Sequence, residues 1–109
     1  MNDRELLELA AKACRLSYKV TEDHVRLLVL GSDNLKRPWN PLAEDGDALR
    51  LAAQLKIDVC FYNGYEEVWA EPSIGDNYGS QSVAFGSDIA GAMRRAIVLV
   101  AVEIGRSMP

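Results

Sequence analysis

The dipeptide Asn63-Gly64 lies between two runs of strand-forming residues, Ile57 to Tyr62 and Tyr65 to Glu71. Asn-Gly is the preferred two-residue loop of a β-hairpin, because both loop positions of such a turn need a positive φ angle. The sequence therefore predicts an antiparallel hairpin in which Tyr62 pairs with Tyr65. Any fold of this chain must include this hairpin and cover at least one of its faces.

Three other segments have the periodicity of helices. Apolar residues recur at three- and four-residue spacing from Leu6 to Cys14, from Glu44 to Lys56, and from Ser87 or Asp88 to Arg106. In front of the first helix, Asn2 is a suitable N-cap, with Glu5 at the capping-box position. The third helix is apolar around much of its circumference, so we expect it to pack on two sides or to contribute to an oligomer interface.

Short strands are predicted at Tyr18 to Val20, within His24 to Leu30, and at 83–85. Pro38 and Pro41 exclude regular helix around Trp39, which is expected to cover an edge of the core. We therefore predict an α+β protein. Its expected form is a small α/β/α sandwich, an antiparallel sheet with three helices in the order α-β-β-α-β-β-α. With 109 residues the chain fits a single domain, residues 1–109.

Charge is unevenly distributed along the chain, whose formal net charge is −4. Between Ile57 and Met93 there are six acidic residues and no lysine or arginine. Since binding of a phosphate backbone needs clustered positive charge, we expect no direct contact with nucleic acid. The N-terminus lacks a secretory pattern, and the longest apolar stretch is too short to span a bilayer. Cys14 and Cys60 match no zinc or redox spacing and are expected to be reduced thiols, so the expected location is the cytosol.

Two stretches, Trp39-Asn40-Pro41-Leu42 and Asp45 to Ala52, resemble a family of small phage and prophage proteins with a helix-sheet-helix (ABA) sandwich domain. The helix-rich ends, Arg4 to Ala13 and Arg94 to Gly105, are also similar to that family. The resemblance covers nearly the whole chain except the hairpin and residues 72–85. It implies an ABA-sandwich fold and a phage protein in the cytosol of its host, and it implies no activity or catalytic residue.

No group in the sequence has the pattern of a catalytic or metal site. His24 is the only histidine, and no serine or cysteine has the sequence context of a nucleophile elbow. Glu44, Asp45 and Asp47 lack the order of a calcium loop, and they suit the positive end of a helix dipole. We therefore expect a protein that is not an enzyme and that needs no cofactor or metal.

The hairpin is the most informative candidate site. In the predicted register, aromatic and acidic residues share one face, whereas Ile57, Val59, Phe61, Val68 and Ala70 share the other, which is expected to be core. The first face carries Asp58, Tyr62, Tyr65, Glu67, Trp69 and Glu71. A helix could cover this face as a second core. Alternatively, the face is open, with tyrosine and tryptophan as anchors for a protein and the acids steering a basic partner.

The leading functional hypothesis is a non-catalytic phage accessory protein that acts through protein contacts. In its sharpest form it is an anti-CRISPR-like inhibitor whose acidic surface occupies the basic nucleic-acid channel of a host defence complex. One alternative is a small ligand-binding or enzymatic domain with a pocket beside residues 72–85, where Asp76, Asn77, Tyr78, Ser80 and Gln81 could supply polar contacts. The other is a homo-oligomeric structural protein, such as a homodimer, that associates through Val98, Leu99 and Val102.

Overall fold

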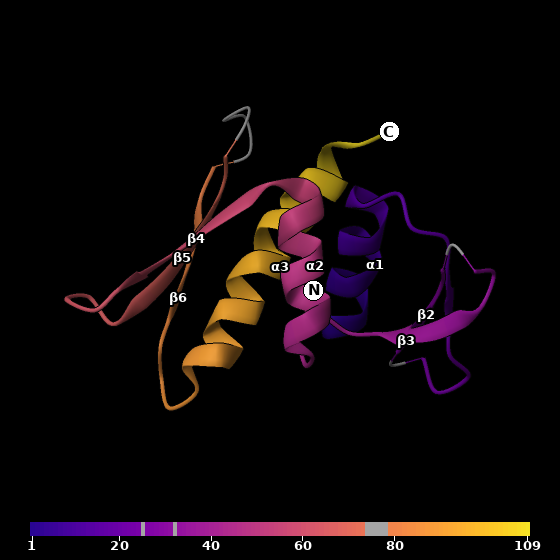
Figure 1. Ribbon diagram of the computed structural model, residues 1–109, viewed down its shortest axis with the longest axis horizontal. Helices are drawn as coiled ribbons and strands as arrows, with labels where there is room; N and C mark the ends of the chain where they lie inside the picture. The colour runs from indigo at the N-terminus through magenta and orange to yellow at the C-terminus, as the bar shows by residue number, and fades with distance from the viewer. Residues whose placement is uncertain (25, 32, 74–78) are drawn as a thin grey trace.

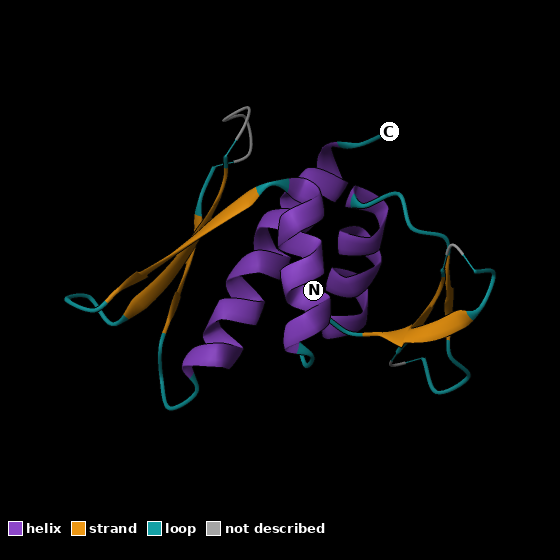
Figure 2. Ribbon diagram, in the orientation of Figure 1, coloured by secondary structure: helices purple, strands orange, loops and turns teal. Residues whose placement is uncertain are grey.

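The computed structural model describes residues 1–24, 26–31, 33–73 and 79–109. Over these ranges the chain has three helices and six strands, shown in Figure 1 and coloured by type in Figure 2. In chain order they are α1 (Asp3–Ala13), β1 (Tyr18–Val20), β2 (Leu27–Leu30), β3 (Lys36–Trp39), α2 (Asp45–Leu55), β4 (Ile57–Tyr62), β5 (Glu67–Pro72), β6 (Gln81–Ala84) and α3 (Ile89–Ser107). The predicted α+β class, with three helices and antiparallel strands, is confirmed.

The strands divide between two antiparallel sheets. In the described part of the chain, β1-β2-β3 form the first sheet and β4-β5-β6 form the second. Figure 1 shows the three helices between them, with the first sheet at the right and the second at the left. The sequence had predicted a single sheet. It did not predict β3, and the short strand that it expected at 83–85 corresponds to β6. The sheets are separate because α2, which connects β3 to β4, runs between them.

Helix α3 is the centre of the core. It packs against α1, against α2, and against β5 and β6 of the second sheet. Ala96, Ile97, Val98, Val100 and Ala101 on this helix are completely buried. Helix α3 is therefore covered on several sides, which explains why much of its circumference is apolar, and the first of the two expectations for this helix is confirmed.

A side chain caps the N-terminal end of α1 and of α3. The Asn2 side chain accepts a hydrogen bond of 2.9 Å from the Glu5 amide, as the capping box predicts. At the start of α3, Asp88 accepts one of 2.9 Å from the Gly91 amide. Each bond satisfies a backbone donor that has no partner inside the helix.

A glycine sets the distance between α1 and α3. A Cβ atom built on Gly105 would lie 2.1 Å from the backbone carbonyl oxygen of Leu9. The two helices therefore cross in backbone contact, and only a residue without a side chain fits at this position.

The helices within the described ranges are too short or too polar to cross a lipid bilayer.

Candidate functional site

The β4–β5 hairpin has a four-residue loop, not the predicted two-residue Asn63-Gly64 turn. Tyr62 pairs with Glu67, and the loop is closed by a bond of 3.2 Å from the Tyr65 amide to the Tyr62 carbonyl. The residue with positive φ is Glu66, at 52°, and neither Asn63 nor Gly64 has this conformation. The register therefore differs from the predicted one by two residues. Because side chains alternate along a strand with a period of two, a shift of two leaves every side chain on its predicted face.

The buried face of the hairpin lies against α3. Val68 and Ala70 are completely buried, and Ile57 is nearly so. Phe61, which was predicted to belong to the core, is 50 % exposed. It lies at the end of the hairpin, which projects beyond the helices in Figure 1, so no helix covers it.

The opposite face of the hairpin is open. Trp69 is 37 % exposed, Tyr62 45 % and Tyr65 76 %. Asp58 and Glu71 are exposed and Glu67 is partly exposed. No helix forms a second core here, since α3 packs on the other face. We call the set Asp58, Tyr62, Tyr65, Glu67, Trp69 and Glu71 the acidic aromatic face; it is the set that the sequence singled out.

The three aromatic rings of this face gather around one hollow. Tyr62 and Trp69 are in edge-to-face contact, with ring centroids 5.8 Å apart and ring planes at 72°. Together with Tyr65 they line a depression of about 250 Å³. Tyr65 reaches this position because it lies in the four-residue loop, outside the strand ladder.

The carboxylates around the aromatic rings have no cationic partner among the described residues. Within the described part of the chain, Asp58, Glu66, Glu67 and Glu71 make no ion pair. The sequence itself places no lysine or arginine between residues 57 and 93. Their charges are therefore not neutralised by the protein, and the face has a negative potential that attracts cations.

The first sheet has the opposite charge character. Its outer face carries Lys19 and Lys36 beside Leu28, Leu30 and Pro38. Neither lysine makes an ion pair with a described residue. Because the two sheets lie at opposite ends of the long axis in Figure 1, the unpaired acids and the unpaired lysines are far apart.

The residues proposed as an oligomer face are not an exposed surface of the single chain. Val98 and Val102 are 0 % and 2 % exposed within the single chain, and Leu99 is partly buried. The sequence proposed Val98, Leu99 and Val102 as a surface for association, but α3 is covered on more than one side, so these residues pack inside the monomer.

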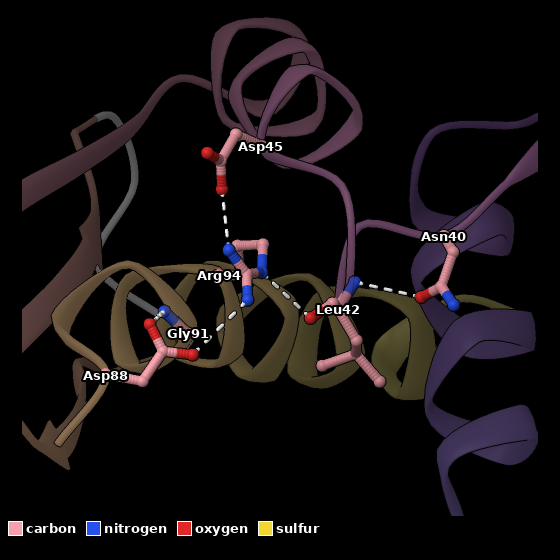
Figure 3. Close-up of polar contacts among 6 residues, drawn as sticks. All are labelled: Asn40, Leu42, Asp45, Asp88, Gly91 and Arg94. Carbon is pink, nitrogen blue, oxygen red and sulfur yellow. Dashed lines mark hydrogen bonds and ion pairs between the residues drawn. The ribbon is translucent and has the colours of Figure 1, made fainter. Parts of the chain in front are cut away.

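Asp45 and Asp47, two of the acids at the start of α2, make contacts that hold the fold together. Figure 3 shows Arg94 of α3 donating to the Leu42 carbonyl at 2.9 Å and contacting Asp45 at 2.6 Å and Asp88 at 3.6 Å. Asn40 receives a bond from the Leu42 amide at 3.1 Å, also drawn in Figure 3.

The neighbouring Asp47 is also satisfied. It accepts from the Asn40 amide at 2.9 Å and pairs with Arg50 at 2.8 Å. No three His, Cys, Asp or Glu side chains of the described residues are placed to hold a metal ion. The segment from Trp39 to Ala52 therefore joins β3, α2 and α3.

The lone histidine and the cysteines do not form a site together. His24 is exposed in the turn before β2, with φ of 58°. Cys14 is buried, and burial raises the pKa of its thiol to about 11. Cys60 is exposed on the open side of β4. The Cys14 thiol therefore stays protonated at neutral pH, where it is a weak nucleophile.

A cavity that the sequence did not predict lies between the end of α1, α2 and the first sheet. It has a volume of about 560 Å³, with Leu16, Val29 and Leu51 among its apolar walls and Arg37 and Arg50 among its polar ones. The two arginines pair with Asp33 and Asp47. No short-range sequence pattern could indicate this cavity, because segments far apart in the chain form its walls.

The sequence predicted a pocket beside residues 72–85; none of the described residues in this range lines the cavity of about 560 Å³ or the hollow between the three aromatic rings. Gln81 belongs to β6, and Ser80 is exposed just before it. Asp76, Asn77 and Tyr78 lie outside the described residues.

No protein family matches the chain, and no significant match was found among curated proteins or among solved structures.

Proposed function

We propose that the protein is a non-catalytic phage accessory protein that binds a basic protein partner through its acidic aromatic face. The observation that carries this proposal is the exposure of Tyr62, Tyr65 and Trp69 among carboxylates that make no ion pair with a described residue. Tyrosine and tryptophan are the commonest anchors of protein interfaces, and unpaired charge around them accelerates association with a partner of opposite sign.

The partner that fits this surface best is a host complex with a basic channel for nucleic acid. A surface rich in carboxylates competes with phosphates for such a channel, and blocking it would inhibit a defence complex in the manner of an anti-CRISPR protein. The same charge disfavours direct binding of nucleic acid by this chain. This function places the protein in the host cytosol.

The proposal is tested by affinity capture from a bacterial lysate, with identification of the captured proteins by mass spectrometry. We expect a basic protein or nucleoprotein complex to be retained by the unaltered chain, and to be lost with Trp69→Ala and with the double variant Glu67→Lys/Glu71→Lys. The matched control is Leu30→Ala, which removes an exposed apolar side chain from the other sheet. A partner that all four proteins retain equally, or no specific partner, would contradict the proposal.

The cavity of about 560 Å³ supports a second candidate function, the binding of a small molecule. Its volume lies within the range of ligand sites, about 300 to 1,000 Å³. A ligand that binds only the folded chain should raise the midpoint of thermal unfolding. An absence of such a shift across nucleotides, sugars and amphipathic acids would count against this function and leave the protein-binding function unaffected.

A further inference from the structure

The hollow on the second sheet has the construction of a cation-binding cage. Its walls are the aromatic rings of Tyr62, Tyr65 and Trp69. The rings of Tyr62 and Trp69 stand at 72° to each other, so they form a corner, not a stack. A corner of this kind lets one bound group contact more than one ring, and the face of an aromatic ring attracts cations.

The backbone holds the third wall in place. Besides the bond from the Tyr65 amide to the Tyr62 carbonyl, the Glu66 amide donates to the Asn63 carbonyl at 3.3 Å. The Glu66 carbonyl in turn accepts from the Phe85 amide at 2.8 Å, which ties the loop to the end of β6. The backbone of Tyr65 is thus fixed before any ligand arrives, and less conformational freedom is lost on binding.

The surroundings of the hollow favour a positive charge. Glu67 pairs with Tyr62 across the hairpin, and Glu71 shares the face of Trp69 two residues farther along β5. Glu66 is next to Tyr65 in the loop. Because these carboxylates have no ion pair in the described part of the protein, they are available to a bound cation.

We propose that this hollow is a recognition cage for an arginine side chain presented by the basic partner. The inference rests on the proposed function and specifies the group that the acidic aromatic face binds. A guanidinium is planar and weakly hydrated, it stacks on aromatic rings, and its five N–H groups can bond to carboxylates at the same time. A lysine ammonium is compact and strongly hydrated, so it contacts the flat faces of the aromatic rings less favourably.

The experiment uses three short peptides that differ at one position. They are acetyl-Gly-Ser-Xaa-Ser-Gly-amide with arginine, citrulline or lysine as Xaa. Citrulline has nearly the shape of arginine without its charge, so it separates cation binding from stacking alone. The full chain, labelled with ¹⁵N, is titrated with each peptide, and binding is read from the indole N–H signal of Trp69, which is assigned by its loss in Trp69→Phe.

We expect saturable binding of the arginine peptide with a dissociation constant on the order of 1 to 10 mM, as for a single side chain on an exposed site. Citrulline should bind at least 10-fold more weakly and lysine at least 3-fold more weakly. Tyr65→Ala should weaken arginine binding at least 5-fold, and because Tyr65 is so exposed, this change leaves the fold intact. Glu67→Gln/Glu71→Gln should weaken it several-fold, and the Leu30→Ala control should not change it.

Three outcomes would overturn the proposal. Equal binding of citrulline and arginine would mean stacking without charge recognition, and equal or tighter binding of lysine would remove the assignment to arginine. Absence of saturable arginine binding up to 50 mM would remove the cage altogether. The lysate capture is separate: if it finds a partner that depends on this face while the titration fails, only the cage is wrong. If the cage binds arginine and no partner is captured, the proposed function fails.

Discussion

The contact between α1 and α3 makes the stability effect of Gly105→Ala calculable. A new Cβ would lie 2.1 Å from the Leu9 carbonyl oxygen and 2.9 Å from its carbonyl carbon, whereas real Cβ contacts essentially never fall below 3.0 Å. The atoms in the way belong to the backbone, so the whole of α1 must move away by about 1 Å, which loosens the core on both sides. Such overpacking costs about 1 to 3 kcal/mol or more, and the higher helix propensity of alanine offsets up to about 1 kcal/mol.

We therefore expect Gly105→Ala to lower the free energy of unfolding by about 1 to 2 kcal/mol, which urea denaturation followed by circular dichroism measures. The matched control is Gly46→Ala in α2, where the new Cβ meets only the end of the flexible Arg50 side chain at 3.3 Å. This variant should be as stable as the unaltered chain or up to about 1 kcal/mol more stable. Equal effects of the two substitutions would refute the argument that backbone contact fixes this helix pair.

Three further predictions concern the site, the loop contacts and the core. Trp69→Ala should cost roughly 1 to 2 kcal/mol of stability because Trp69 is partly exposed, whereas Trp39→Ala, at a residue only 7 % exposed, should cost about 3 to 5 kcal/mol; chemical denaturation of both variants checks this. Arg94→Ala should lower stability by about 2 kcal/mol because the Leu42 carbonyl and the carboxylate of Asp45 lose their donor, and Arg94→Lys should recover at most half of this in the same assay. Burial raises the pKa of the Cys14 thiol from 9.0 to about 11, so between these values the unfolded chain has lost a proton that the folded chain keeps. The free energy of unfolding should therefore fall as the pH rises from about 9 to about 11, by on the order of 2 kcal/mol, and Cys14→Ala should not show this part of the decrease.

Local patterns predicted the elements of the fold well. The N-cap at Asn2, the helix Asp45–Leu55 and the strand Ile57–Tyr62 all follow from short-range chemistry that the structure preserves. The division into two sheets could not be predicted in this way. It depends on where α2 runs between β3 and β4, and no local pattern determines that path.

The sequence correctly predicted that the strand residues of the acidic aromatic face share one face of the hairpin, but it predicted the wrong turn. Side chains alternate along a strand, and the predicted and observed registers differ from each other by two residues. Trp69 and Tyr62 therefore lie on one face in either register. Asn63-Gly64 does not form the two-residue turn that Asn-Gly prefers; it belongs to a four-residue loop. The four-residue loop puts Glu66 in the left-handed conformation and lets its carbonyl bond to Phe85, a contact from a distant part of the sequence.

Whether that face is covered or open was undecidable from the sequence. Tyrosine, tryptophan and acids are compatible with the rim of a core and with an interface, and the choice depends on which side of the sheet α3 occupies. The position of α3 in the fold also explains why Val98 and Val102 were wrongly expected to be exposed. A helix that packs on several sides also buries residues that lie off the one face marked by its apolar periodicity.

Selective quenching of Trp69 fluorescence tests the central claim that this tryptophan is exposed in a negative field. Trp39 is buried, so ionic quenchers reach only Trp69, and Trp69→Phe shows what remains without it. Quenching by caesium and by iodide is compared at equal ionic strength. Each quenching constant is divided by the constant that the same ion gives with free N-acetyltryptophanamide. We predict that the normalised constant is larger for caesium than for iodide, and that Glu67→Lys/Glu71→Lys reverses the order. Stronger quenching by iodide in the unaltered chain, or a Trp69 that neither ion reaches, would contradict the account.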